Sequence, residues 1–128
     1  MENVEYLSPD WARAVEQALK GRTMGNITAA ATFQHHRTPT GKEQYLYLSY
    51  LRGAFERLAL GEGEGPAATF CLNGDYAVYA EVLRGTLDAS RAISTGKLRL
   101  KGNLVQIMRL APFIHVITDA LCAVPTCF

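Results

Sequence analysis

Residues 96–103 read Gly-Lys-Leu-Arg-Leu-Lys-Gly-Asn and contain the clearest strand pattern of the chain. Basic residues alternate strictly with leucine over 97–101, which is the period-two pattern of a strand with one buried face. Asn103 is followed three residues later by Gln106, and this spacing is typical of a capping box at the start of a helix. We therefore predict a strand at 97–101 and a helix that begins after Asn103.

Two helices are predicted immediately upstream of this strand. Asp88 can cap a short helix, and an earlier helical stripe starts at Tyr76. Gly85 stands where that helix would end in a left-handed C-cap.

The first half of the chain predicts one helix and then strands. Ser8 before Pro9 indicates the N-cap and first position of a helix over 9–20. Alternating or continuous apolar runs follow, bounded by loops rich in glycine and proline, and they predict strands near 27–34, 45–51, 55–60 and 67–72. The run 45–51 is apolar on both faces. Neighbouring strands joined by short loops imply a mainly antiparallel sheet, and the whole layout is α+β.

The segment after Pro112 has two interpretations. Its apolar residues follow helical spacing from Phe113 to Leu121, so something must cover this stripe. Pro112 interrupts or restarts the helix and offers a hinge. The segment is either a lid that closes over a ligand, with Phe113 and Ile117 as its contacts, or a docked helix that completes the core.

Composition describes one globular domain, residues 1–128. The chain is 48% apolar and 20% charged, and its 13 basic and 12 acidic residues nearly balance, which is unlike a nucleic-acid-binding protein. No signal-peptide pattern is present, the longest apolar run is too short to cross a bilayer, and the cysteine count is odd. We expect a cytoplasmic protein whose three thiols are free, with Cys71 buried in a strand.

One local charge bias stands out. Five basic residues share a stretch with the single acid Asp88; they are Arg91, Lys97, Arg99, Lys101 and Arg109. They either protect an edge strand from unwanted pairing or make a weak, transient contact with a membrane surface or an anionic lipid headgroup.

The sequence shows no recognisable catalytic machinery, metal-ligand set or cofactor motif. His35 and His36 are adjacent beside a predicted loop, so we expect both to be solvated. His115 and Asp119 are four residues apart and could form a base and its orienting carboxylate. They lie opposite the apolar stripe of their helix, however, where polar residues are ordinary. We therefore name no catalytic residue, no metal site and no cofactor.

The stretch 96–103 resembles the sterol carrier protein type two lipid-transfer family, whose members show a Gly-Lys-hydrophobic-x-hydrophobic-x-Gly strand followed by a helix. The similarity covers about 67–114, including Leu83-Arg84-Gly85 and Leu110-Ala111-Pro112-Phe113. The resemblance implies a five-stranded, largely antiparallel sheet with helices over one face, enclosing a hydrophobic tunnel. The tunnel positions expected here, each of which could instead be plain core, are Phe33, Leu48, Phe70, Leu83, Ile93, Leu104, Met108, Phe113 and Ile117.

The leading functional hypothesis is non-enzymatic binding and transfer of a lipid or another hydrophobic small molecule in that tunnel. The alternative is a small cofactor-free enzyme acting on a hydrophobic biosynthetic intermediate in the same pocket, with Tyr50, Tyr79, His115 or Asp119 as its polar groups. A third hypothesis is an accessory domain that self-associates through its apolar C-terminus; the sequence does not determine the oligomeric state.

Overall fold

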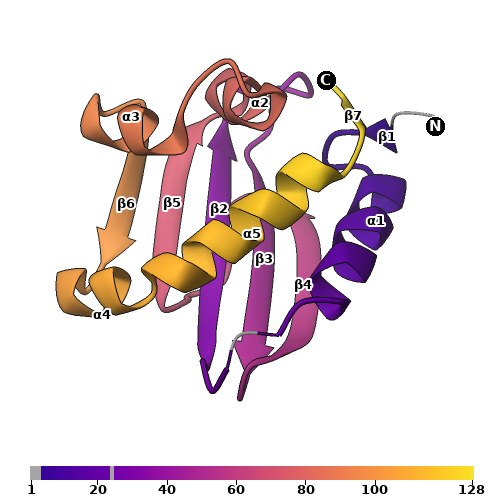
Figure 1. The fold of residues 1–128 in the computed structure, drawn as a ribbon. Coiled ribbons are helices and arrows are strands. Elements are labelled where there is room, and N and C mark those ends of the chain that lie inside the picture. The colour runs from indigo at the N-terminus through magenta and orange to yellow at the C-terminus, as the bar shows by residue number, and fades with distance from the viewer. Residues whose placement is uncertain (1–3, 24) are drawn as a thin grey trace.

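The computed structural model describes residues 4–23 and 25–128, and the side chain of Leu104 lies outside the described part. A five-stranded sheet forms its centre, with helices over one face (Figure 1). The strands, in the order β4-β3-β2-β5-β6, are β4 (Ala54–Glu62), β3 (Gln44–Leu51), β2 (Ala29–His36), β5 (Phe70–Asp75) and β6 (Leu98–Gly102). β2 and β5 run parallel and the other neighbours antiparallel. The predicted α+β class and mostly antiparallel sheet are confirmed.

Three of the five helices in the described part begin at a residue whose side chain caps them. The helices are α1 (Pro9–Lys20), α2 (Tyr76–Arg84), α3 (Ala89–Ser94), α4 (Leu104–Arg109) and α5 (Ala111–Ala123). The side chains of Ser8, Asp88 and Asn103 accept hydrogen bonds from backbone N–H groups in the first turns of α1, α3 and α4. Gly85 ends α2 with φ 81°, as predicted. Pro112 lies in the first turn of α5, where its missing N–H breaks no helical hydrogen bond.

The two ends of the chain meet in a short parallel pair. β1 (Val4–Glu5) pairs with β7 (Thr126–Cys127), and the indole N–H of Trp11 donates to Thr126 Oγ1 at 3.2 Å. Neither strand is long enough to give a period-two pattern, so the sequence analysis did not predict this pair.

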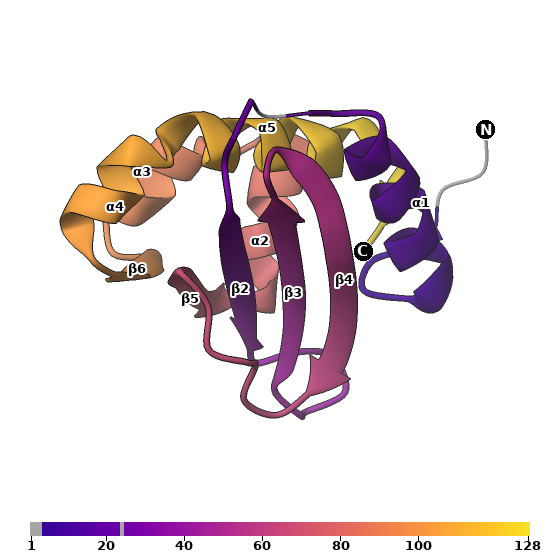
Figure 2. The same ribbon diagram turned by 90° about the horizontal axis from the view of Figure 1, so that it is seen from below.

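The core lies between the sheet and α1 and α5. Trp11 from α1, Leu48 from β3 and Phe113 from α5 are fully buried. The ring of Phe113 packs edge-on against Tyr50 and Phe70, with centroid distances of 5.6 and 6.1 Å. Figure 2 shows α5 running along the side of the sheet that also carries α1.

The opposite face of the sheet is partly covered by the loop between β4 and β5. Thr32 Oγ1 donates to the carbonyl of Pro66 at 2.7 Å, and the amide of Gln34 donates to the carbonyl of Gly63 at 2.7 Å. A side chain at Gly65 would bring its Cβ within 2.5 Å of Thr32 Cγ2 and 3.0 Å of Tyr45 Cβ. This loop therefore covers part of the second face of the sheet, at Thr32 and Gln34 of β2 and at Tyr45 of β3.

The structure changes two local predictions. The strand expected at 67–72 is β5, shifted towards the C-terminus to Phe70–Asp75. Cys71 lies on the face away from the helices and is half-buried rather than buried; all three cysteines are free. No helix in the described ranges has the length and apolar character that a membrane crossing requires.

Candidate functional site

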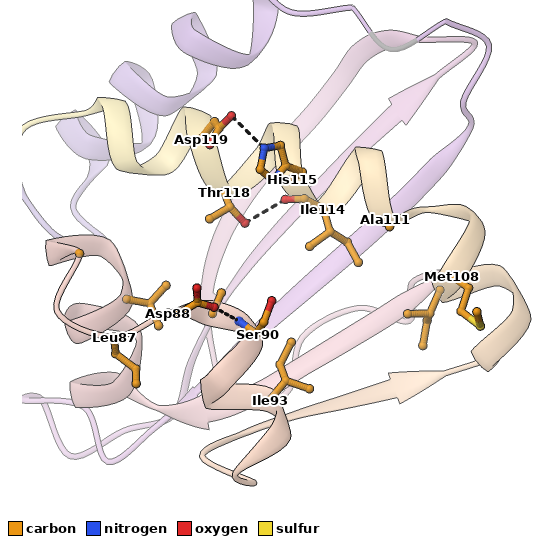
Figure 3. Close-up of a pocket in the computed structure, with 14 residues that line it drawn as sticks. Leu87, Asp88, Ser90, Ile93, Met108, Ala111, Ile114, His115, Thr118 and Asp119 are labelled. Atoms are coloured by element: carbon orange, nitrogen blue, oxygen red, sulfur yellow. Dashed lines mark hydrogen bonds and ion pairs between the residues drawn. The ribbon is translucent and has the colours of Figure 1, made fainter.

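A groove of about 750 Å³ opens between the α2–α3 connection, α4 and α5 (Figure 3). Its size falls within the ordinary range of roughly 300–1,000 Å³ for small-molecule sites. Most of its wall is aliphatic, and the large apolar side chains that line it are Val82, Leu87, Ile93, Ile107, Met108 and Ile114. Two of the helices that border the groove, α3 and α4, have only six residues each.

A small cavity of about 40 Å³ lies beside the groove, on the side nearer the sheet. Val82, Ala89 and Thr118 line both spaces and form the junction between them. Deeper in, the cavity reaches Phe33 and Leu83. Its volume is close to that of one water molecule, so a long apolar chain would enter only if the junction residues moved apart.

Eight of the nine predicted ligand-binding residues fall into three groups. Ile93 and Met108 line the groove, and Phe33 and Leu83 line the internal cavity. Four others are buried in the core and line neither space; they are Leu48, Phe70, Phe113 and Ile117. Leu104 was also predicted, but its side chain lies outside the described part. As ligand contacts, all nine remain a prediction.

The groove is polar at the end away from α4. Asp88 and Asp119 face it from the start of α3 and from α5, whereas Met108 lies at the α4 end (Figure 3). His115 Nε2 lies 3.6 Å from Asp119 Oδ2, and both side chains are largely exposed. Lysine and arginine are absent from the described residues that line the groove. The polar end therefore carries two carboxylates and one imidazole.

His35 is buried, which corrects the prediction that both adjacent histidines are solvated. It is fully inaccessible, whereas His36 is partly exposed and pairs with Glu43. The reason is the strand period: His35 continues the inward-facing series Ala29, Ala31 and Phe33. That alternation was visible in the sequence, but the neighbouring loop led us to expect solvent.

A closed hydrogen-bond network holds His35 in place. Its Nδ1 lies 2.9 Å from the carbonyl oxygen of Phe33, which can only accept, so this nitrogen carries the proton. Its Nε2 therefore accepts from the hydroxyl of Tyr6 at 2.7 Å. The ring of Tyr79 stacks on the imidazole at 3.9 Å between centroids, and its hydroxyl donates to backbone carbonyls. Tyr6 and Tyr79 also line the internal cavity.

Burial sets the ionisation of this network. It lowers the pKa of His35 from its ordinary value to about 3; the carbonyl of Phe33 opposes this shift, and the nearby His36 reinforces it. Burial also raises the pKa of both Tyr6 and Tyr79 well above their usual range. The three groups are therefore neutral at pH 7, and the cavity that they border carries no charge from them.

Sequence reasoning missed the residues that join the groove to its interior. In the sequence, Val82 lies beside the main apolar stripe of its helix, and Thr118 lies opposite the stripe of its own. They become important because α2 and α5 approach each other over the sheet and turn these flanks towards one space. A flanking position gives no periodic signal of its own.

Comparison with known families gives one clear result. The model of the SCP-2 sterol transfer family matches residues 9–115, which is most of the chain. A search of curated proteins gives no match.

Solved structures of similar fold include three that cover most of this chain. A crystal structure of sterol carrier protein 2 is 25% identical, with a TM-score of 0.75 over 94% of this chain and 99% of that one. A conserved hypothetical protein from Thermus thermophilus is 23% identical, with a TM-score of 0.76 over 99% of this chain and 94% of the other. Palmitated SCP2L2 from Aedes aegypti is 14% identical, with a TM-score of 0.55 over 80% and 93%.

Proposed function

Because the chain belongs to the SCP-2 sterol transfer family, we propose that it binds a lipid or another hydrophobic small molecule without covalent chemistry and carries it between donor and acceptor. The observation that supports this proposal most directly is the groove of about 750 Å³ with mostly aliphatic walls, which shares three lining residues with a smaller apolar cavity. Apolar pockets with a few polar groups at one end are how such ligands are held.

The geometry suggests how the ligand would lie. Its apolar body would contact the aliphatic wall that includes Ile107 and Ile114, and its polar end would lie near Asp88 and Asp119. A longer chain would pass the junction at Val82 into the internal cavity. Burial of apolar surface would provide most of the affinity, at roughly 25 cal/mol for each Å² removed from water.

The first test enlarges a junction residue. Val82→Phe places a ring between groove and cavity, so we expect affinity for a fluorescent long-chain alcohol to fall about tenfold, since overpacking a filled space costs roughly 1–3 kcal/mol. Val105→Phe makes the same chemical change at an exposed residue that does not line the groove, and should leave affinity unchanged. Fluorescence titration measures both. Equal affinities in two folded variants would remove the junction from the site.

The charges at the polar end give a second prediction, about the headgroup. Two carboxylates and no basic lining residue disfavour an anionic ligand, so a long-chain alcohol should bind about fivefold more tightly than the fatty acid of equal length at pH 8. A fatty acid is a natural comparison because the Aedes aegypti relative is palmitated.

A matched variant isolates this effect. Asp88→Asn with Asp119→Asn removes both charges, and asparagine remains a good N-cap for α3. The alcohol should bind the variant with its native affinity. The affinity of the fatty acid for the variant should rise towards that of the alcohol. A fatty acid that binds the native protein more tightly than the alcohol would contradict the headgroup prediction and leave the groove proposal intact.

A second candidate function, catalysis on a bound hydrophobic intermediate, has one observation in its favour. His115 and Asp119 share the groove wall, as a base and its orienting carboxylate would. Because both side chains are largely exposed, water competes for each. If the pair is catalytic, His115→Ala would abolish turnover of the intermediate; if the protein is a carrier, the same variant would still bind and release its ligand at the native rate.

A further inference from the structure

The segment 89–109 concentrates the positive charge of the protein. It contains five of the 13 basic residues and none of the 12 acidic ones, so the rest of the chain has eight basic residues against 12 acidic. All five basic side chains are exposed. None of them takes part in the ion pairs found among the described residues. This segment is therefore strongly cationic in a chain that is otherwise acidic.

The same segment carries most of the exposed apolar side chains. In the described part, four large hydrophobic residues are exposed, and three of them are Ile93, Val105 and Met108. Met108 is 70% exposed and Val105 is 59% exposed. The fourth, Leu51, lies at the end of β3 and belongs to another part of the sheet. Exposed apolar side chains that gather on one segment, rather than being scattered singly, are typical of an interaction surface.

These residues share one edge of the fold. Figure 1 shows α3, β6 and α4 together at the side of the sheet opposite α1. β6 is an edge strand; Leu98 and Leu100 face the helices, so Lys97, Arg99 and Lys101 point to the other face. We call the exposed surface of residues 89–109 the cationic edge.

The mouth of the groove opens at the cationic edge. Ile93 and Met108 belong to both, and Ile107 lines the groove from the same helix as Met108 (Figure 3). A molecule that leaves the groove past Met108 therefore emerges beside the exposed apolar side chains of the edge, whereas Lys97, Arg99 and Lys101 lie on the other face of β6.

We propose that the cationic edge docks on the surface of an anionic lipid bilayer, with Val105 and Met108 entering the headgroup region and the basic residues contacting lipid phosphates and carboxylates. A bilayer matches both halves of this surface, because it presents negative charge over apolar chains. A nucleic acid would use the cations alone and gain nothing from exposed Met and Val side chains. The edge also has no Phe, Tyr or Trp on which bases could stack.

The experiment is cosedimentation of the full chain with phosphatidylcholine vesicles that contain either none or about 30% phosphatidylserine. Binding should require phosphatidylserine and should weaken between 0.1 and 0.5 M NaCl, because each basic residue near the surface contributes about fivefold in affinity and salt screens it. The triple variant Lys97→Glu, Arg99→Glu, Lys101→Glu should bind at least tenfold more weakly. Its control, Lys20→Glu, Lys42→Glu, Arg52→Glu, makes the same change of net charge elsewhere and should bind like the native protein.

A second pair of variants tests the apolar half. Met108→Asp should reduce vesicle binding at least fivefold, whereas Leu51→Asp, at the exposed residue outside the edge, should not. Equal binding to both kinds of vesicle, or equal losses in the variants and their controls, would overturn the proposal. The protein could instead bind polyuridylate as tightly as it binds vesicles, with no change in the Met108→Asp variant. That result would assign the edge to nucleic acid.

The outcome is separable from the groove proposal. The triple charge variant does not alter the groove lining, so it should bind the soluble fluorescent alcohol with native affinity. Loss of vesicle binding with intact probe binding supports docking. Native vesicle binding by that variant overturns docking, whatever the groove binds.

Discussion

Acid should destabilise this protein through a single buried imidazole, by on the order of 4 kcal/mol between pH 6.5 and pH 3. In the folded chain the pKa of His35 is about 3, against about 6.5 in the unfolded chain. Between these values the unfolded state binds the proton and the folded state does not. The free energy of unfolding therefore falls as the pH falls, by up to about 1.4 kcal/mol for each pH unit.

Urea unfolding at intervals from pH 7 to pH 4 measures this dependence. Carboxylates also titrate in this range, so the informative quantity is the difference between the native protein and His35→Gln. Glutamine can still accept from the Tyr6 hydroxyl but cannot be protonated, and its pH dependence should be much shallower.

His36→Gln is the matched control for this prediction. It replaces the neighbouring histidine, which is partly exposed and paired with Glu43, and should keep the steep dependence of the native protein. Parallel curves for the native protein and His35→Gln would show that His35 is not held neutral by burial.

Replacing Phe113 by alanine should cost about 3–5 kcal/mol of unfolding free energy, the second large effect. Phe113 is fully buried and packs edge-on against both Tyr50 and Phe70, so its removal leaves a cavity under the middle of the sheet. His115→Ala lies on the same helix with an exposed side chain and should change stability by less than about 0.5 kcal/mol. Thermal and urea unfolding measure both variants.

Truncation and hydrogen exchange separate the two interpretations of the segment after Pro112. If the segment is a docked helix, the domain loses cooperative unfolding when the chain is cut after Ala111. The helix amides are then protected from hydrogen exchange to the same degree as the amides of β6, even without ligand. A lid stays folded after the cut and gains protection only when ligand is added. The burial of Phe113 and Ile117 in the core favours the docked helix.

Much of the fold could be predicted because its signals are local. Ser8, Asp88 and Asn103 each cap a helix through their own side chains, and Gly85 ends α2 with a backbone conformation that favours glycine. The alternation at 97–101 identifies β6 for the same reason, since neighbouring residues of a strand face opposite ways. These features depend on a few consecutive residues, so no knowledge of the rest of the chain was needed.

The candidate site was predicted less well because burial depends on what covers a face. The apolar stripe at 113–121 fits a core helix and a lid equally, and only the packing of Phe113 against β3 and β5 places it in the core. Ile93 and Met108, by contrast, were predicted from the same kind of facing but lie in an open groove. Apolar periodicity shows that a face must be covered by something; it does not show whether protein, ligand or membrane covers it.

The helix caps, the strand period and the five basic residues within 89–109 can all be read from consecutive residues of the chain. Three other features depend on packing: His35 is buried, Val82 and Thr118 line both the groove and the cavity beside it, and Ile93 and Met108 of the cationic edge border the groove. The physical reason is the range of the interactions: caps and alternation are formed within a few residues, whereas each of these three features requires segments far apart in the chain to be packed around the same space.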